Sequence, residues 1–427
     1  MIQSFNKINR ISGTLSLPGD KSISHRALLI ASMADGESSI VNLPDSVDIK
    51  STINCLKSLG IKIEIVRDKT IVYGKGFKGF SPPTGIINAG NSGTTARLLS
   101  GILAAQNFES TIEGDSSLSS RPMGRIIEPL TLMGSKIKSN NGRLPLQIYP
   151  AERFRPINYE LPIASAQVKS AILLAGIHLD DETTVIESGQ TRNHTEILLD
   201  INVIKEDRKI ISCVSRKNYP NTKDYFISGD ISSAMFFIVL TLLTENSELL
   251  IKNISLNPTR TESINLLKRM GGNIQVDVKG ESNKEVYGDL LVKSSNLSIV
   301  KIDFEIIPLI IDEIPILTIA GLFADGDFEI RGASELRVKE SDRIKALISN
   351  FHLLGLETEE YPDGFKVLGE IKKSKQSFQC FGDHRIAMAF AILSSLLKDG
   401  GKVEGFESVA ISNPQFLDQL KSITAKF

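Results

Sequence analysis

The feature that most constrains the fold of this chain is an internal repeat. A nearly all-apolar helix, a turn and an alternating strand recur about every 70 residues, which is typical of a repeat architecture. In four copies a second helix then ends at a Leu-Gly or Met-Gly pair, and two further strands follow it. The glycines of these pairs, Gly60, Gly134, Gly271 and Gly355, stand where a helix C-cap needs a left-handed residue. Six copies are present, beginning near Leu17, Gly93, Ser165, Ile231, Ile314 and His384.

The composition of the repeated elements predicts how they pack. The first helix of a copy is apolar on every side, as in AMFFIVLTLL (234–243), so it should be buried all round. The strands alternate apolar and polar residues, so one face of each sheet can meet water. We therefore expect an α/β fold with helices inside and sheets outside. It should contain six helix–strand–helix–strand–strand repeats, three in each of two lobes.

Two similar breaks in the chain predict where the lobes meet. LPGD (17–20) matches SGD (228–230), which lies between the third and fourth copies. The first segment should then pair into the C-terminal lobe, so that the chain crosses twice. We expect a discontinuous C-terminal lobe (1–18 and 229–427), an N-terminal lobe (19–228) and an active site in the cleft between the lobes.

Charge and cysteine content exclude several classes of function. The 49 Lys and Arg residues nearly balance 50 Asp and Glu residues, so the formal net charge of −1 would attract neither nucleic acid nor a membrane. Cys55, Cys213 and Cys380 have no CxxC or histidine-flanked spacing, which argues against a disulfide framework and a metal site. The start of the chain has no apolar signal core, and the longest apolar run is about half of what a bilayer needs. We expect a soluble cytoplasmic protein.

Anion-binding side chains gather where the repeated helices begin. A helix N-terminus offers free N–H groups and the positive end of the helix dipole, so it favours anions. The first helix adds Lys21, Ser22 and Arg26 at this place. Similar groups recur at or near later helix starts, namely Gly93 in a loop of small residues, Arg121, Ser165, Gln167, Arg192, Lys339, Arg343 and Arg385.

Two carboxylates complete this set of residues. Asp312 precedes the fifth inner helix, and Glu340 lies in RVKESDRI, where Lys339 and Arg343 should share one helix face. Taken singly, each residue has an ordinary interpretation: Asp312 and Asn91 as helix caps, the cations as a solvated surface. Their recurrence at matching positions favours a site for two phosphorylated or carboxylated small molecules, with Asp312 and Glu340 handling protons.

Eight segments resemble the signatures of the 5-enolpyruvylshikimate-3-phosphate (EPSP) synthase family. In family order they are LPGDKSISHRALLIAS, GNSGTTARL, RPMGR, ASAQVKSAILLAG, SGQTRNHTE, SGDISSA, RVKESDRI and GDHRIAMAFA. RVKESDRI together with DHRIAMA is highly specific, and GNSGTT and AQVKSA resemble the bacterial branch called class II. The resemblance implies the enolpyruvyl transferase fold, a two-lobed inside-out α/β barrel.

The resemblance also implies a reaction. The enolpyruvyl group of phosphoenolpyruvate would pass to the 5-hydroxyl of shikimate 3-phosphate, in the shikimate pathway of aromatic amino acid biosynthesis. The reaction would proceed by addition and elimination through a tetrahedral intermediate, without a metal, a cofactor or a covalent enzyme adduct. The partners would be these two small molecules, and the protein a monomer.

The motifs carry the family's site residues onto this chain. The catalytic residues would be Asp312, Glu340 and Lys21. Shikimate 3-phosphate would be bound by Lys21, Ser22, Arg26, Ser165, Gln167, Arg192, Asp312 and Lys339. Phosphoenolpyruvate would be bound by Lys21, Gly93, Arg121, Gln167, Arg343 and Arg385. Asp312 would be the base for the 5-hydroxyl, and Glu340 would handle the proton at the methylene carbon.

The chain departs from the family pattern at two places. The family's SDD run is SVD here (46–48), and its SFP run is SNP (412–414). Ile411 stands where some members have a phosphoenolpyruvate-binding lysine, so that contact is not expected. Gly93 stands where a larger residue would narrow the phosphoenolpyruvate pocket, so glyphosate should compete with phosphoenolpyruvate.

Two alternative functions stay open. The sister transferase that acts on UDP-N-acetylglucosamine shares the fold but places a reactive cysteine in a flexible loop. Here Cys55 lies on a predicted helix, Cys213 in a strand region and Cys380 ahead of the last inner helix. The other alternative is an inactive anion-binding protein on the same fold, although such a protein would be expected to lose some of the charged residues above.

Overall fold

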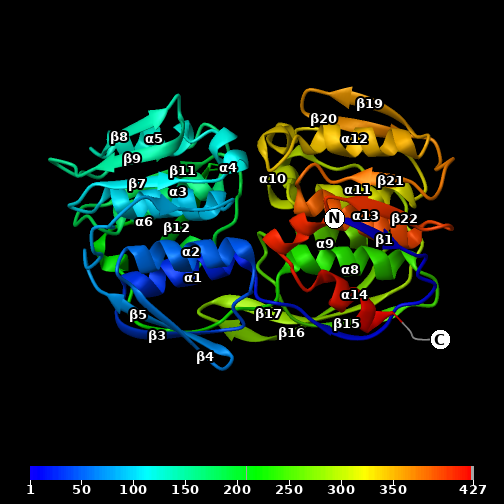
Figure 1. The fold of residues 1–427 in the computed structure, drawn as a ribbon, viewed down its shortest axis with the longest axis horizontal. Coiled ribbons are helices and arrows are strands. Elements are labelled where there is room, and N and C mark those ends of the chain that lie inside the picture. Colours follow the sequence, from blue (N-terminus) through cyan, green and yellow to red (C-terminus); the bar gives the residue numbers. More distant parts are fainter. Residues whose placement is uncertain (208, 425–427) are drawn as a thin grey trace. The chain divides into compact units, whose positions relative to one another are not determined.

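The chain forms two compact units, which are described separately (Figure 1). The computed structural model describes residues 1–207 and 209–424. The N-terminal unit comprises residues 19–227 and 281–285, and the C-terminal unit comprises residues 1–18, 228–280 and the chain from 286 onward.

The N-terminal unit contains three copies of the repeat. The first is α1 (Lys21–Met33), β3 (Asp35–Val41), α2 (Val47–Ser58), β4 (Lys62–Val66) and β5 (Lys69–Lys75). The second is α3 (Gly93–Ala104), β7 (Ser110–Glu113), α5 (Gly124–Leu132), β8 (Lys136–Asn140) and β9 (Arg143–Tyr149). The third is α6 (Ala166–Gly176), β11 (Thr183–Glu187), α7 (His194–Leu198), β12 (Asn202–Glu206) and β13 (Lys209–Val214). Shorter elements are β6 (Ile87–Asn88), α4 (Ser116–Ser120), β10 (Asn158–Glu160), η1 (Arg216–Asn218) and β14 (Asp224–Phe226).

Each copy in this unit contributes one four-stranded sheet. The strand orders are β14-β3-β5-β4, β6-β7-β9-β8 and β10-β11-β13-β12. The strand that follows the inner helix pairs parallel with the edge strand and antiparallel with the last strand of its own copy. In the first sheet, for example, Ile40 is opposite both Tyr225 and Thr70.

The C-terminal unit contains the other three copies. The fourth is α8 (Ile231–Leu243), β15 (Glu248–Ser255), α9 (Glu262–Arg269), β16 (Asn273–Ser282) and β17 (Glu285–Lys293). The fifth is α11 (Ile314–Leu322), β18 (Phe328–Ile330), α12 (Arg343–Leu353), β19 (Glu357–Tyr361) and β20 (Gly364–Leu368). The sixth is α13 (His384–Leu396), β22 (Gly401–Glu404) and α14 (Phe416–Ile423). The remaining elements are β1 (Ile2–Phe5), β2 (Ser12–Ser16), η2 (Phe304–Ile306), α10 (Ile307–Ile310), η3 (Ser334–Val338), β21 (Ser377–Gln379) and η4 (Phe406–Ile411).

The first residues of the chain complete two sheets of the C-terminal unit. The strand orders are β16-β17-β15-β2, β18-β20-β19 and β1-β22-β21. β2 pairs parallel with β15, so that Leu15 lies opposite Ile251. β1 pairs antiparallel with β22, where Phe5 lies opposite Gly401. Up to residue 424, the last one described, the sixth copy adds no strand pair after β22, and β1 takes the antiparallel place beside β22.

The inner helices form the core of each unit. α8, α11 and α13 contact one another, and in the N-terminal unit α3 contacts both α1 and α6 (Figure 1). The apolar side chains of these six helices are almost all buried, whereas the outer helices bury one face. The predicted fold class, with helices inside and sheets outside, is confirmed. The predicted C-cap glycines also have the left-handed conformation, at Gly60, Gly134, Gly271 and Gly355.

Local capping explains where the inner helices begin. A Gly-Asp pair precedes α1, α8 and α13, and the side chains of Asp20, Asp230 and Asp383 accept N–H groups of the first turn. Ser92 and Ser165 do the same for α3 and α6. Each cap satisfies donors that a buried helix end could not otherwise pair.

The tip of the β16–β17 hairpin, residues 281–285, belongs to the N-terminal unit although its strands lie in the other one. The Ser282 hydroxyl accepts the Phe226 N–H (3.0 Å), and Glu285 lies 2.6 Å from His194 in a buried pair. The boundaries expected from the sequence, at 18 and 228, assigned these five residues to the C-terminal lobe.

We predict that Gly101→Ala destabilises the protein. A Cβ at Gly101 in α3 would lie 2.1 Å from the carbonyl oxygen of Ala171 in α6, so the two helix backbones would have to separate. Overpacking of this kind costs about 1–3 kcal/mol or more. The measurement is the urea midpoint followed by circular dichroism, which should fall.

Gly124→Ala is the matched control. Gly124 is also helical, in α5, but its Cβ would meet nothing within 4 Å. Alanine favours a helix over glycine by about 1 kcal/mol, so the midpoint should stay or rise slightly. Equal midpoints for the two variants would show that the α3–α6 approach is not this close.

Candidate functional site

The first cluster of charged residues lies in the N-terminal unit, where α1 begins. Lys21 is the first residue of α1, and its Nζ lies 2.7 Å from Oδ2 of Asp48 in α2. Asp48 is the single carboxylate left in the SVD run, and it is buried. The pair fixes the Lys21 ammonium at the positive end of the helix dipole, where an anion would bind.

Arg26 lies about one turn further along α1 and is buried. Its Nε donates to Oγ1 of Thr195 (2.7 Å), its Nη2 to Oγ of Ser170 (2.8 Å) and its Nη1 to the carbonyl oxygen of Ser22 (3.0 Å). Burial lowers the pKa of Arg26 to about 10, against the opposing effect of Glu196, so the group stays charged at pH 7. Each Nη carries a second N–H, so the guanidinium can also donate to an anion.

The loop before α7 brings Arg192 to the same place. Its Nη1 lies 3.5 Å from Oγ of Ser22. A buried ion-pair network holds both ends of this loop: Nζ of Lys169 in α6 lies 2.5 Å from Oε2 of Glu187 and 2.6 Å from Oε1 of Glu196. The network connects α6 with β11 and α7, between which the loop runs.

The starts of α3 and α6 bring Gly93 and Gln167 together through Arg97. Nη1 of Arg97 donates to Oε1 of Gln167 (2.7 Å), and Nε2 of Gln167 donates to Oγ1 of Thr94 (2.9 Å). A Cβ at Gly93 would lie 2.8 Å from Nη1 of Arg97 and 3.5 Å from Nη1 of Arg121. Arg97 was not among the predicted residues. Its signal in the sequence is a single cation, four positions after Gly93, in a helix that is otherwise uncharged.

Two details near α3 differ from expectation. Ser92 caps the helix by accepting the Thr95 N–H (3.2 Å), so the ordinary interpretation of Asn91 as the cap is wrong. Asn91 instead accepts a hydrogen bond from Nη2 of Arg121 (2.8 Å). Arg121 ends α4, and α5 begins only at Gly124, so Arg121 does not stand at a helix start. Its Nη2 also donates to Oγ of Ser117 (3.3 Å), so side-chain contacts, and not the start of a helix, position this guanidinium.

The second cluster lies in the C-terminal unit and surrounds Asp312. Oδ1 of Asp312 lies 3.4 Å from Nζ of Lys339 and 3.3 Å from Nη1 of Arg343, and Oδ2 lies 3.6 Å from Nη2 of Arg385. The Asp312 side chain is 12% exposed. Glu313, not Asp312, occupies the N-cap position of α11, so the ordinary interpretation of Asp312 as a cap is wrong.

Arg343 is bound by three carboxylates although it is only 1% exposed. Its Nε lies 2.7 Å from Oδ2 of Asp383, its Nη2 lies 2.6 Å from Oε2 of Glu340, and its Nη1 approaches Asp312. Burial opposes the charge, but Asp383, Glu340 and Asp312 together raise the pKa of Arg343 above its ordinary value. Asp383 was not predicted as a site residue. Its place in the Gly-Asp pair before α13 is a signal for a cap, and its second oxygen meets Arg343.

RVKESDRI does not form one helix. η3 ends at Val338 and α12 begins at Arg343, with Lys339 the first of the residues between them. The Asp342 side chain accepts the Lys345 N–H (3.1 Å) and so caps α12, which fixes the start of that helix after the motif's first residues. The spacing had suggested that Lys339 and Arg343 share one helix face, and this prediction is wrong. The two side chains instead come near each other because both contact Asp312.

The two clusters differ in charge. Among the residues described above, the N-terminal cluster sets Lys21, Arg26, Arg97, Arg121 and Arg192 against Asp48 and the helix cap Asp20. Lys169 with Glu187 and Glu196 forms the neighbouring ion-pair network. The C-terminal cluster sets three cations against four carboxylates, because Oε1 of Glu313 also lies 3.6 Å from Nη1 of Arg385. The first arrangement is suited to binding anionic groups. The second holds carboxylates in contact with cations, which suits proton transfer beside an anion.

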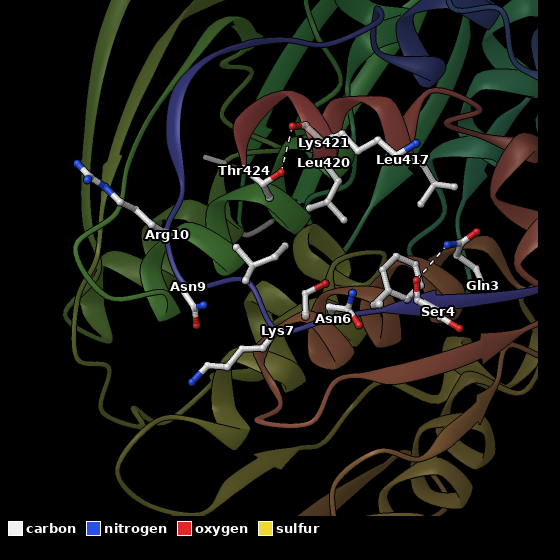
Figure 2. Close-up of a pocket in the computed structure, with 13 residues that line it drawn as sticks. Gln3, Ser4, Asn6, Lys7, Asn9, Arg10, Leu417, Leu420, Lys421 and Thr424 are labelled. Atoms are coloured by element: carbon white, nitrogen blue, oxygen red, sulfur yellow. Dashed lines mark hydrogen bonds between the residues drawn. The ribbon is translucent and has the colours of Figure 1, made fainter. Parts of the chain in front are cut away.

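Other features of the described residues do not compete with these clusters. The pocket in Figure 2, of about 400 Å³, lies between residues 3–10 and α14, and the side chains of Lys7 and Arg10 extend away from it. Within residues 1–207 and 209–424, no three His, Cys, Asp or Glu side chains gather as they would around a metal ion. None of the helices in this part of the chain has the length and apolar character that crossing a membrane requires.

Comparisons with known proteins identify relatives of the whole chain. A sequence model of the family EPSP synthase (3-phosphoshikimate 1-carboxyvinyltransferase) matches residues 5–420. The 3-phosphoshikimate 1-carboxyvinyltransferase of Petrotoga mobilis is 46% identical over 420 residues, which cover 97% of each chain. The protein of the same name from Bacillus subtilis is 38% identical over 426 residues, 99% of each chain.

Solved structures agree with these relatives. EPSP synthase from Acinetobacter baumannii matches with a TM-score of 0.86 and 35% identity, covering 99% of this chain and 98% of that one. The enolpyruvyl transferase NikO from Streptomyces tendae, at 15% identity, shares the fold with a TM-score of 0.77, covering 100% of this chain and 97% of that one. The family expected from the motifs is confirmed, and the chain belongs to the EPSP synthase family.

Proposed function

We propose that this chain transfers the enolpyruvyl group of phosphoenolpyruvate to the 5-hydroxyl of shikimate 3-phosphate and releases phosphate, as a step of the shikimate pathway. Its family makes it a carboxyvinyl transferase. The observation that carries the proposal is the contact of Asp312 with Lys339, Arg343 and Arg385, because it joins a base to cations that can hold anionic substrates.

The proposed reaction is an addition followed by an elimination. The 5-hydroxyl oxygen bonds to C2 of phosphoenolpyruvate and gives up its proton, while C3 receives a proton and becomes a methyl group. The tetrahedral intermediate then loses phosphate from C2 and a proton from the methyl group, which restores the double bond. The atoms balance without an oxidant, a metal or an organic cofactor.

The N-terminal cluster supplies binding groups in this proposal. Ser22, Arg26, Ser165, Gln167 and Arg192 bind shikimate 3-phosphate. Lys21, Gly93, Arg121 and Gln167 bind phosphoenolpyruvate, and Lys21 also contacts shikimate 3-phosphate. The excess of cations over carboxylates in this cluster supports the assignment, since both substrates carry phosphate and carboxylate groups.

The C-terminal cluster supplies the proton-transfer groups. Asp312 takes the proton of the 5-hydroxyl, and Glu340 handles the proton at the methylene carbon. Lys339 and Asp312 hold the hydroxyls of shikimate 3-phosphate, and Arg343 and Arg385 bind phosphoenolpyruvate. Lys21 joins Asp312 and Glu340 as a catalytic residue by stabilising charge on the leaving phosphate. Arg343 is already bound by carboxylates, so a substrate anion would take the place of one of them.

The proposal includes the setting in which the enzyme works. We place it in the cytoplasm as a monomer, with two small-molecule substrates and neither nucleic acid nor a membrane as partner. Its three cysteines are free thiols, which is compatible with a reducing compartment.

The cysteines also bear on the transferase that uses UDP-N-acetylglucosamine. Cys55 lies in α2, Cys213 in β13 and Cys380 ahead of α13, as the sequence predicted. Burial raises the pKa of the Cys55 thiol to about 12 and also raises that of Cys213. Reactive cysteines need a lowered pKa, so these positions support shikimate 3-phosphate as the acceptor.

The first test is phosphate release. Wild-type protein should release phosphate only when shikimate 3-phosphate and phosphoenolpyruvate are both present, and not when UDP-N-acetylglucosamine replaces the former. Binding of both substrates without release, measured by calorimetry, would instead favour an inactive anion-binding protein.

We predict that Asp312→Asn lowers kcat by about 10²- to 10⁴-fold, because the amide keeps the shape of the carboxylate but cannot accept the proton. Binding of shikimate 3-phosphate should persist in calorimetry. Asp418→Asn is the control, since this side chain in α14 is exposed and should leave kcat unchanged. A normal kcat for Asp312→Asn would assign the base elsewhere.

We predict that Gly93→Ala weakens inhibition by glyphosate. The new methyl group would lie 2.8 Å from Nη1 of Arg97, so that side chain would have to shift, and it would be in ordinary contact with Nη1 of Arg121 at 3.5 Å. Between phosphorus and the carboxyl carbon, glyphosate has one more bond than phosphoenolpyruvate has, so it is the longer molecule. Narrowing the site should therefore weaken the binding of glyphosate more than that of phosphoenolpyruvate. Its inhibition constant should rise by about 10- to 200-fold, the range that one methyl group can produce.

The measurement is steady-state inhibition against phosphoenolpyruvate. Gly85→Ala is the control, because a Cβ at Gly85 would meet nothing within 4 Å. If Gly93→Ala and wild type are inhibited equally, the glycine does not border the phosphoenolpyruvate site.

A further inference from the structure

A chain of buried hydrogen bonds runs from His25 to the start of α3. His25 in α1 is completely buried, and its Nδ1 lies 2.7 Å from Oγ1 of Thr52 in α2. Oγ1 of Thr52 lies 2.7 Å from Oγ1 of Thr95 in α3. The Thr95 hydroxyl donates to Oγ of Ser92 (2.8 Å), which is the cap of α3. Three helices are thus joined through four side chains.

The direction of the hydrogen bonds follows from counting protons. Each hydroxyl has one hydrogen to donate. Thr95 donates to Ser92, so it must accept from Thr52. Thr52 has then used its own hydrogen and must accept from His25. The other acceptor near Thr52, the carbonyl oxygen of Asp48, is 3.5 Å away and is a weaker alternative. His25 therefore carries its hydrogen on Nδ1.

The surroundings of His25 keep the ring neutral. Its Nε2 is buried and has no hydrogen-bond partner among the described residues, so an N–H there would be left unpaired. Burial, and next the charges of Lys21 and Arg26, lower the pKa of His25 well below its ordinary value, although Asp20 acts in the opposite direction. A neutral ring preserves the order of donors along the chain.

The hydrogen-bonded chain connects helices that carry neighbouring residues of the N-terminal cluster. Lys21 precedes His25 by about one turn of α1, and its partner Asp48 precedes Thr52 by one turn of α2. Gly93 lies between Ser92 and Thr95, and Arg97 follows in the next half turn. The chain therefore sets the distance between Lys21 on one helix and Gly93 with Arg97 on another.

We propose that His25 is a positioning residue that, through Thr52 and Thr95, holds the start of α3 against Lys21 and so sets the affinity for phosphoenolpyruvate. The inference rests on the function proposed above. It assigns no contact between His25 and either substrate. Two groups proposed to bind only shikimate 3-phosphate, Arg192 and Ser165, lie outside the hydrogen-bonded chain. Arg26 follows His25 on α1 but is held by Thr195 and Ser170 of the third copy.

The test compares variants that break the chain with variants that keep it. Thr95→Val removes the hydroxyl at nearly constant volume, and His25→Leu removes the donor to Thr52. Thr95→Ser keeps the hydroxyl, and His25→Asn keeps an N–H donor near the position of Nδ1. Thr241→Val is the control, since the Thr241 hydroxyl, buried in α8, bonds only to a carbonyl of its own helix in the described contacts.

The readouts are kcat, the KM of each substrate, and the dissociation constant of phosphoenolpyruvate by calorimetry with shikimate 3-phosphate present. We expect each breaking variant to raise the KM and the dissociation constant of phosphoenolpyruvate by about 5- to 50-fold, as loss of a buried hydrogen bond would. The KM of shikimate 3-phosphate should stay within about twofold. The double variant, with His25→Leu and Thr95→Val together, should resemble each single variant, since both substitutions break the same chain of hydrogen bonds. The Ser, Asn and Thr241 variants should resemble wild type.

Three results would overturn the proposal: equal rises in both KM values, multiplied effects in the double variant, or no recovery in Thr95→Ser and His25→Asn. If His25→Leu does not fold, as judged from its urea midpoint, the Thr95 pair decides alone. A wild-type protein that binds phosphoenolpyruvate but releases no phosphate would remove the proposed function, and the dissociation constants would still decide the role of His25. A wild-type protein that does not bind phosphoenolpyruvate would overturn both.

Discussion

The burial of the inner helices on every side is the constraint on which the rest of the structure depends. A helix such as α8 or α11 has no solvated face, so a charged side chain in its middle would lie unpaired among apolar groups. Its N-terminal end is different, because the free N–H groups there already need partners. The charged residues of the inner helices, such as Lys21, Arg97 and Arg385, therefore lie in the N-terminal half of each helix. The architecture itself places binding groups together.

In each unit, a buried cation is paired with more than one carboxylate. Lys169 is shared by Glu187 and Glu196, and Arg343 by three carboxylates. Replacing such groups with apolar side chains is often neutral or stabilising, whereas removing one member costs about 3–5 kcal/mol. Their value here is geometric, since they fix the loop before α7 and the approach of Asp312. The two groups hold site residues in place more than they stabilise the fold.

The repeat, the inner helices and the C-cap glycines could be predicted because each depends on short sequence patterns. The break in RVKESDRI could not, since Asp342 competes for the backbone in a segment whose charges fit one helix equally well. Arg97 and Asp383 were missed because their roles arise from contacts between separate copies of the repeat. The position of the 281–285 hairpin tip has the same origin: its partners, among them His194, are distant in sequence.

The pairing of β1 and β2 has a consequence for synthesis on the ribosome. These strands are made before their partners β22 and β15, which come some 200 to 400 residues later. At about 5–20 residues per second, the first 18 residues wait tens of seconds as an unpaired segment. Meanwhile the three copies between residues 19 and 227 can assemble around their own helices. The beginning of the chain is thus among the last parts to become native, and its exposed edge is the one that chaperones would need to protect.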